Sequence, residues 1–286
     1  MSVRIIPRLD IKGPNLVKGV QLEGLRVLGR PEAFARRHYE DGADELLYMD
    51  VVASLYERNS LHDIIERTSR EIFIPLTVGG GLRSLDDIRA VLRRGADKVA
   101  LNTAAVRRPE LIREAAREFG SSTVVVSIEA KRRANGRYEA YTDNGRERTG
   151  VDVFRWAAEA VELGAGEIMI TSIDCEGTGA GFDIELTARV AEESPVPVIA
   201  CGGAGAIDDV YEAITQGRAE AVSMASLLHY QVVSENGGPT EDAGAPSRPV
   251  KAFSRIDPCS LPRLKRYLAE RGVDCRYEEE AVNVSY

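Results

Sequence analysis

Residues 73–81, with the sequence FIPLTVGGG, return in similar form as residues 196–204, VPVIACGGA, 123 positions further along the chain. The same offset relates residues 97–103, DKVALNT, to residues 220–226, EAVSMAS. Self-similarity at a fixed offset is the mark of a repeated architecture, because chance repetition of separate motifs in register is improbable. In the same way, LDIK at 9–12 aligns with IEAK at 128–131, at an offset of 119. The chain therefore looks like two equivalent halves.

Short β-branched runs alternate along the whole chain with amphipathic stretches of helical period. The eight runs begin at Arg4, Glu45, Phe73, Asp97, Thr123, Glu167, Val196 and Glu220. Helical patterns lie between them, as in residues 108–119 and 151–163. Apolar strands separated by helices are typical of parallel sheets that are buried on both faces. We therefore predict an α/β fold, a (βα)8 TIM barrel with half-barrel symmetry, over a single domain of residues 1–286; an open doubly wound sheet is the alternative, although it rarely repeats so evenly.

Three segments interrupt the pattern. Residues 132–148 contain two short alternating runs and predict a hairpin-like insertion after the fifth strand. Residues 230–258 are rich in Gly, Pro, Ser and Asn and predict a mobile loop before a last helix at 261–271. The tail, 273–286, is acidic and then apolar, and its sequence fits either a frayed or a docked end.

Composition narrows the class of protein. Of 286 residues, 44% are hydrophobic and 29% are charged, as in a globular protein with a sizeable core. The net charge of −8 and the absence of a Lys/Arg-rich block argue against a nucleic-acid partner. No apolar run is long enough for a membrane span, and no signal peptide is visible, so we expect a cytoplasmic protein. The cysteine and histidine spacings fit no metal site or disulfide framework, and no cofactor motif is present.

Pairs of small residues follow four of the predicted strands, at the barrel face where active sites of this fold lie. Glycine lets the backbone approach a phosphate, and a hydroxyl at a helix N-terminus adds a donor. For a single pair, the alternative is that the glycines only form a tight turn between a strand and a helix. Two symmetric sets of such residues favour a small substrate that carries two phosphates. The predicted phosphate-binding residues are Gly80, Gly81, Asn102, Thr103, Gly202, Gly203, Ala225 and Ser226.

Asp10 ends the first strand and Glu129 ends the fifth, so the repeat places them opposite each other. Two carboxylates in one cleft can divide general-acid and general-base roles, because their surroundings push their pKa values apart. The alternative is a pair of rim carboxylates that are solvated or paired with Lys12 and Lys131. Position and symmetry favour catalysis.

Several polar residues near the same face are candidates for substrate contacts. Lys18 lies in the long segment 13–29, which could close over a substrate; a solvated loop lysine is an equal alternative. Asp50 ends the second strand and Asp174 the sixth, and both could bind hydroxyl groups or simply cap turns. From the segment TSIDCEGT that contains Asp174, we also assign Thr171, Glu176 and Gly177 to substrate binding.

The opposite, N-terminal face carries charges of alternating sign. Arg4, Glu45, Lys98 and Glu167 stand at or near the starts of four strands. Such a group predicts a salt-bridged ring on the barrel floor. Taken alone, it is interpreted as a structural plug, since features on this face of a barrel usually concern stability.

The motifs RIIPRLD, FIPLTVGGG, GADKVALNTAA, ELGAGEIMITSID and VPVIACGGAG resemble those of the cyclase subunit of imidazole glycerol phosphate synthase, from histidine biosynthesis. The resemblance covers about residues 3–230 and 261–273. It implies a (βα)8 barrel that binds phosphoribulosyl-formimino-aminoimidazole carboxamide ribonucleotide through two phosphate sites and needs no cofactor. It also implies a heterodimer with a glutaminase docked on the N-terminal face, from which ammonia travels through the barrel.

By this resemblance Asp10 matches a catalytic aspartate and Lys18 a lysine that contacts the substrate. Asp97 matches a residue that faces the glutaminase. The floor ring is reinterpreted as the charged gate of the ammonia channel, because all four gate positions are filled: Arg4, Glu45, Lys98 and Glu167.

The chain departs from the family pattern around the active-site mouth. Glu129 stands where the family has a second catalytic aspartate, and Arg8 stands where it usually has cysteine. Cys175 and Glu176 interrupt a motif that usually reads Asp-Arg-Asp-Gly-Thr. The extra methylene of glutamate moves a carboxylate by on the order of 1 Å, and a shift of that size can cost about 10²-fold in rate.

Three functions fit these observations. The chain makes imidazole glycerol phosphate with Glu129 in place of aspartate; or it resembles the paralogues that deliver ammonia to amidate a sugar in surface-polysaccharide synthesis. The third hypothesis is a catalytically weak partner that only activates a glutaminase. Retention of Asp10, Lys18 and both phosphate sites argues against the third.

Overall fold

The computed structural model describes residues 2–53, 61–235 and 255–277. Its centre is a closed ring of eight parallel strands, in which the last strand pairs with the first. Around the ring the strands are β1 (Arg4–Lys12), β4 (Leu46–Asp50), β5 (Leu76–Gly79), β6 (Lys98–Leu101), β7 (Val124–Arg132), β10 (Glu167–Ser172), β11 (Val198–Cys201) and β12 (Ala221–Met224). The predicted (βα)8 barrel is confirmed.

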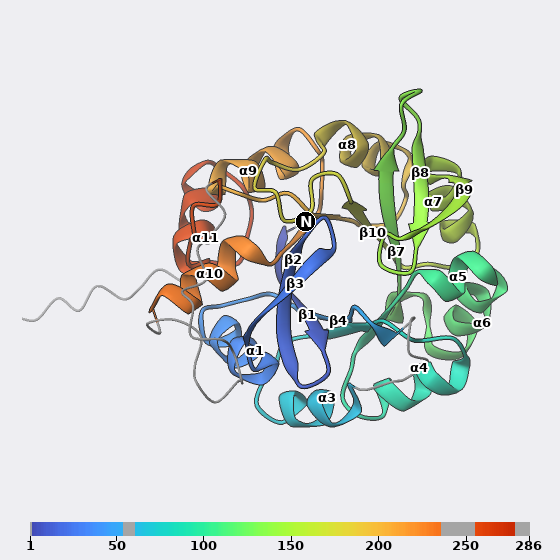
Figure 1. Ribbon diagram of the computed structural model, residues 1–286, viewed down its shortest axis with the longest axis horizontal. Coiled ribbons are helices and arrows are strands. Elements are labelled where there is room, and N and C mark those ends of the chain that lie inside the picture. The colour runs from blue at the N-terminus through green and yellow to red at the C-terminus, as the bar shows by residue number, and fades with distance from the viewer. Residues whose placement is uncertain (1, 54–60, 236–254, 278–286) are drawn as a thin grey trace, which may run out of the picture.

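Helices surround the strands as an outer layer (Figure 1). They are α1 (Pro31–Glu40), α3 (His62–Ser69), α4 (Leu85–Leu92), α5 (Thr103–Arg107), α6 (Glu110–Phe119), α7 (Val153–Glu162), α8 (Ile184–Glu193), α9 (Ile207–Thr215), α10 (Ser226–Glu235) and α11 (Leu261–Glu270), with a short 3-10 turn, η1 (Ser121–Thr123). Most of the helices bury one apolar face against the strands, which is why the sequence alternates between the two periods, whereas α10 is buried along most of its length. Within the described residues no helix is long and apolar enough to cross a membrane.

Two antiparallel hairpins extend the barrel at the same place in each half. The segment 13–29, expected to be a loop, instead forms β2 (Asn15–Val20) and β3 (Glu23–Gly29), and β2 pairs with the end of β1. The predicted hairpin after the fifth strand is present as β8 (Tyr138–Thr142) and β9 (Glu147–Asp152), and β8 pairs with the end of β7. Each hairpin thus follows a strand that carries one of the two candidate catalytic carboxylates, and the internal repeat includes the hairpins (Figure 1).

The structure corrects three boundaries. Phe73 lies outside β5, with 79% of its surface exposed, because the strand begins only after Pro75, which has no N–H to donate. Residues 230–235 belong to α10 rather than to the expected loop, since their apolar side chains pack on the core; residues 236–254 of that predicted loop lie outside the described residues. The tail is docked as far as Arg276: the Val3 amide donates to the Asp274 carbonyl at 2.7 Å, and Arg276 pairs with Asp44 at 3.0 Å; residues 278–286 lie outside the described range.

Side chains that point into the barrel form a separate apolar cluster. It consists of Ile6, Leu47, Ala100, Val125, Met169, Ile199, Cys201 and Ala221, with Met49 packed against it. The cluster lies between the starts of the strands and their carboxyl ends, and it separates the charged floor from the upper face. The charged floor and the polar residues of the upper face therefore both border an apolar interior.

Candidate active site

Asp10 and Glu129 stand on β1 and β7 near the carboxyl ends of these strands, and both are buried, with 3% and 8% of their surface exposed. They are close enough for the charge of Asp10 to raise the pKa of Glu129. The alternative that they are solvated rim carboxylates is wrong. Pairing with Lys12 and Lys131 is also absent: the cationic partners of Asp10 are Arg8 and Lys18.

Asp10 is held as an anion. The Arg8 Nε donates to its Oδ1 at 2.8 Å, and the Lys18 Nζ lies 3.7 Å from its Oδ2. Burial alone would raise the pKa of Asp10, but the positive charges of Arg8 and Lys18 outweigh burial and lower it. Residues 8 and 10 project on the same side of β1, so the strand itself places the guanidinium beside the carboxylate.

Glu129 has the opposite environment. Its Oε2 accepts a hydrogen bond from the Gly145 amide at 2.8 Å, and no cation pairs with it among the described residues. Burial raises the pKa of Glu129 to about 7, although the Gly145 amide and the more distant Arg8 charge partly offset that rise. The hairpin β8–β9 supplies Gly145 and thus positions the carboxylate. Near neutral pH the pair therefore consists of one fixed anion and one group that can hold a proton.

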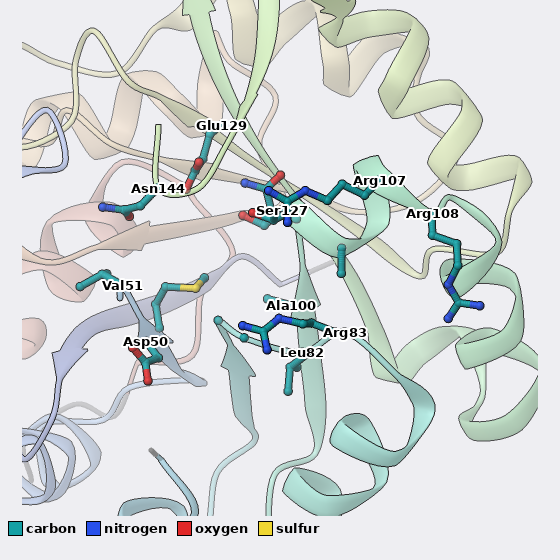
Figure 2. Close-up of a pocket in the computed structure, with 16 residues that line it drawn as sticks. Asp50, Val51, Leu82, Arg83, Ala100, Arg107, Arg108, Ser127, Glu129 and Asn144 are labelled. Carbon is teal, nitrogen blue, oxygen red and sulfur yellow. The ribbon is translucent and has the colours of Figure 1, made fainter. Parts of the chain in front are cut away.

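The first predicted phosphate site is an open cavity of about 230 Å³ at the ends of β4, β5 and β6. Of the predicted residues it brings together Asp50, Gly80, Gly81, Asn102, Thr103 and Glu129. Figure 2 shows Arg83 and Arg107 extending across the pocket on the side opposite Asp50 and Glu129, while Arg108 lies at the outer edge. Cations on one side and carboxylates on the other suit a substrate with an anionic end and a reacting centre.

Gly80 is where this cavity most needs a residue without a side chain. Its φ is +94°, and a Cβ there would lie 2.3 Å from the Asp50 carbonyl oxygen. The backbone can therefore reach the cavity only through glycine.

We expect Gly80→Ala to destabilise the protein and to weaken phosphate binding at the first cavity. The left-handed φ alone costs about 1–2 kcal/mol, and displacement of the Asp50 backbone adds to it. Gly136→Ala is the matched control, because Gly136 has φ +79° with nothing within 4 Å of its Cβ position. Thermal unfolding should show the larger loss for Gly80→Ala; equal losses would mean that the close approach to Asp50 has no effect.

The second predicted phosphate site is almost filled. It is a cavity of about 10 Å³ at the ends of β11 and β12. Its walls include the predicted Lys18, Glu176, Gly177, Gly202, Gly203, Ala225 and Ser226, together with Arg8, Cys201 and Ser223, which the prediction did not include. Lys18 belongs to β2, is 4% exposed and forms an ion pair with Glu176, so the alternative of a solvated loop lysine is wrong.

Thr171 and Asp174 line neither of these two cavities. Thr171 is buried within β10, and the Asp174 Oδ2 accepts a hydrogen bond from the Arg132 amide at 2.9 Å. Asp50 accepts from the Val52 amide at 3.1 Å while also lining the first cavity. The turn-capping alternative thus describes Asp50, two residues from Val52, whereas Asp174 contacts the distant end of β7 and, among the described residues, caps no turn of its own.

The floor carries a closed ring of ion pairs. Arg4 contacts Glu45 at 2.8 Å and Glu167 at 2.7 Å, and Lys98 contacts the same two carboxylates at 2.9 and 2.6 Å. The Thr77 hydroxyl also donates to Glu45. Asp97 is exposed at this face, and its Oδ2 accepts from the Leu76 amide at 2.8 Å.

Sequence reasoning gave no site role to several residues that line the two cavities, among them Arg8, Arg83, Arg107, Ser127 and Asn144. Two of them carried usable signals. Arg8 stands two positions before Asp10 in a strand, and Arg107 follows Asn102 and Thr103 by about one helical turn. Asn144 reaches the cavity only because its hairpin folds back, which the sequence does not show.

Fold and site together define a class: a (βα)8-barrel enzyme with two buried carboxylates beside two cavities at the predicted phosphate sites. Residues 4–234 match the family described as histidine biosynthesis protein, and the chain belongs to that family. The proteins most like it include three that are named imidazole glycerol phosphate synthase subunit HisF. The one from Legionella pneumophila is 60% identical over 208 residues, which are 73% of this chain and 98% of the relative.

The other two relatives match over a longer part of the chain. The protein from Alkaliphilus metalliredigens is 48% identical over 234 residues, covering 82% of this chain and 93% of the relative. The protein from Nostoc sp. is 48% identical over 237 residues, covering 82% and 92%. The family resemblance that the sequence motifs predicted is thereby confirmed.

Proposed function

We propose that this chain is the cyclase subunit of imidazole glycerol phosphate synthase in histidine biosynthesis. It uses ammonia to convert phosphoribulosyl-formimino-aminoimidazole carboxamide ribonucleotide into imidazole glycerol phosphate and aminoimidazole carboxamide ribonucleotide, with release of one water molecule. The observation that carries this proposal is the pair of buried carboxylates with opposite pKa shifts between two anion-binding sites. The names of the relatives point to the same reaction.

The two carboxylates divide the proton transfers that ring formation requires. Asp10, whose pKa is lowered by Arg8 and Lys18, remains ionised and accepts protons or stabilises positive charge. Glu129, whose pKa is raised to about 7, carries the proton that a leaving nitrogen needs. The phosphates at either end of the substrate fix the reacting atoms between the two groups.

Ammonia enters from the floor in this proposal. A glutaminase subunit docks on the N-terminal face, beside exposed Asp97, and forms a heterodimer with the barrel. Neutral ammonia then passes the ring of Arg4, Glu45, Lys98 and Glu167 and crosses the apolar interior cluster, which disfavours charged ammonium. The four cysteines are free, which suits a reducing cytosol.

Each cation of the ring pairs with both carboxylates. We therefore expect a substitution in the ring to lower turnover with glutamine, which needs ammonia from the glutaminase, more than turnover with ammonium salt. Lys98→Met removes the ion pairs with both Glu45 and Glu167 and should lower glutamine-dependent turnover by on the order of tenfold. Turnover with ammonium salt should change little, since the site at the other face is intact. Arg218→Met, which removes a cation from an exposed pair with Glu192, is the control. Equal losses with both nitrogen sources would argue against a gate.

The comparisons favour this function over the sugar-amidating alternative, because the relatives carry the synthase name. Complementation tests it directly. The chain is expressed in a bacterium that lacks its own cyclase subunit, on medium rich in ammonium and free of histidine. Growth is the expected result; soluble expression without growth would contradict the proposal, and growth that requires Asp10 would exclude a partner that only activates a glutaminase.

A further inference from the structure

The two anion-binding cavities differ although their sequences repeat. The first has a volume of about 230 Å³ and the second only about 10 Å³. A space of roughly 10–15 Å³ holds one water molecule, so a phosphate group enters the second cavity only if a side chain leaves it. That side chain is Glu176, whose Oε2 lies 3.0 Å from the position of a Cβ on Gly202. Its carboxylate therefore stands close to the glycine backbone that a phosphate would approach.

The charges of the second cavity favour a phosphate that replaces a carboxylate over a phosphate that binds in addition to the carboxylates. Arg8, Asp10, Lys18 and Glu176 are between 2% and 4% exposed, and their formal charges cancel. A phosphate dianion added to this group would leave uncompensated negative charge in a buried place, which is costly. Asp10 is held by both cations, whereas the one ion pair of Glu176 within the described part of the chain is with Lys18. Glu176 is thus the carboxylate that can be displaced.

Two hydroxyl groups in the same cavity lack acceptors. The side chains of Ser223 and Ser226 are buried and make no hydrogen bond with any described residue. The Ser226 hydroxyl lies near the Tyr230 phenol, but outside hydrogen-bond geometry. Buried donors without a partner are uncommon in folded proteins. Oxygen atoms of a bound phosphate would satisfy both.

Arg8 links this cavity to the catalytic carboxylate. Its Nε donates to Asp10, and its Nη1 lies 3.4 Å from the Cys201 Sγ, next to Gly202. An anion in the second cavity would therefore meet two buried cations, Arg8 and Lys18. The backbone of Glu176 is fixed meanwhile, since its amide donates to the Ser172 carbonyl at 3.0 Å and its carbonyl accepts from the Gln21 amide at 2.7 Å. Only its side chain needs to turn.

We propose that Glu176 is a resident counter-ion that fills the second phosphate site of the free protein. The second phosphate of the substrate displaces it from Lys18 and binds Lys18, Arg8 and the two serine hydroxyls. This inference rests on the proposed function for a substrate with two phosphates. It makes Glu176 a specificity-determining residue: the open cavity is filled first, and the closed one opens more readily for an anion that the first site already holds nearby than for a free one.

Titration with inorganic phosphate, followed by NMR of backbone amides, reads the two sites separately. Gly80 and Gly81 report the first cavity, and Gly202 and Gly203 report the second. In the unmodified protein we expect the second pair to require at least about tenfold more phosphate than the first, given the ion pair that must break. Equal affinities at the two pairs, or no shift at Gly202 and Gly203 at any concentration, would overturn the inference.

Glu176→Gln removes the competing charge while keeping the shape of the side chain. Affinity at Gly202 and Gly203 should rise about tenfold or more, and affinity at Gly80 and Gly81 should stay unchanged. Glu192→Gln, at an exposed ion pair with Arg218, is the matched control and should alter neither. Unchanged affinity at the second site in folded Glu176→Gln would also overturn the inference.

The outcome is independent of the reaction. If Glu176→Gln fails to fold, the difference between the two sites in the unmodified protein still decides the question. A chain that shows this phosphate pattern but does not turn over the histidine precursor keeps the inference and loses the proposed function. A chain that turns over the precursor but binds phosphate equally well at both sites keeps the proposed function and loses the inference.

Discussion

Asp10→Asn is expected to reduce ammonium-dependent turnover by about 10²–10⁴-fold, the range associated with loss of one general acid or base. The amide keeps the size of the side chain but removes the negative charge that faces Arg8 and Lys18. The substitution also leaves two buried cations with less compensation, and removal of one partner from a buried pair costs about 3–5 kcal/mol. Turnover is therefore measured at a temperature at which circular dichroism shows the variant to be folded.

Asp44→Asn separates the two effects. Asp44 is also an ion-paired aspartate of low exposure, but it contacts Lys265 and Arg276, and it accepts from the Ile5 amide on the opposite side of the barrel. The Asp44→Asn variant should be less stable than the unmodified protein but should keep its ammonium-dependent turnover. If the two variants lose activity in proportion to their stability, Asp10 has no special part in the chemistry.

Glu129→Gln is expected to have an effect of similar size, about 10²–10⁴-fold. Burial raises the pKa of Glu129 to about 7, so the group is protonated below that pH and ionised above it. If Glu129 donates a proton, turnover of the unmodified protein falls as pH rises through about 7, and the residual activity of Glu129→Gln lacks this descending limb. Asp10, whose pKa is lowered, contributes no limb in this range.

Glu139→Gln is the matched control for Glu129. Glu139 lies in the adjacent β8, is 8% exposed like Glu129, and accepts from a hairpin amide, that of Gly150, at 3.0 Å. It pairs with Arg133 and Arg148 outside the cavity. Its pH profile should match that of the unmodified protein. A limb near 7 that survives in Glu129→Gln would assign the titration to another group.

The barrel could be predicted because its signals are local. Each strand is a short apolar run between helices, and the glycines after β5 and β11 mark the same turn in both halves. The segment 13–29 was not predicted as a hairpin, because its two turn residues, Gln21 and Leu22, adopt φ values of 50° and 64° without being of the Asn-Gly type that marks such a turn. The second hairpin did carry such a signal, since Asn144-Gly145 lies in the turn between β8 and β9.

The sequence indicated which residues belong to the site, but not which cavity is filled or how the surroundings shift the pKa of each carboxylate. Position on the strands identified Asp10, Glu129 and the glycines. The repeat suggested two equivalent phosphate sites, yet the structure fills one of them with Glu176, which reaches Lys18 from 158 positions away in the chain. Such a contact depends on tertiary packing of β2 against the segment after β10, and no local pattern encodes it. The environment that raises the pKa of Glu129 has the same origin, since burial and the hairpin amide of Gly145 exist only in the folded barrel.

The most direct test of the account is the turnover of the purified, unmodified chain with phosphoribulosyl-formimino-aminoimidazole carboxamide ribonucleotide and saturating ammonium, beside Glu129→Asp. Loss of the substrate's absorbance and formation of imidazole glycerol phosphate are measured together. The account predicts robust turnover by the unmodified protein, with glutamate serving as the second acid–base group. No turnover by the unmodified protein, with activity appearing only in Glu129→Asp, would contradict it and would mean that the site works on another acceptor.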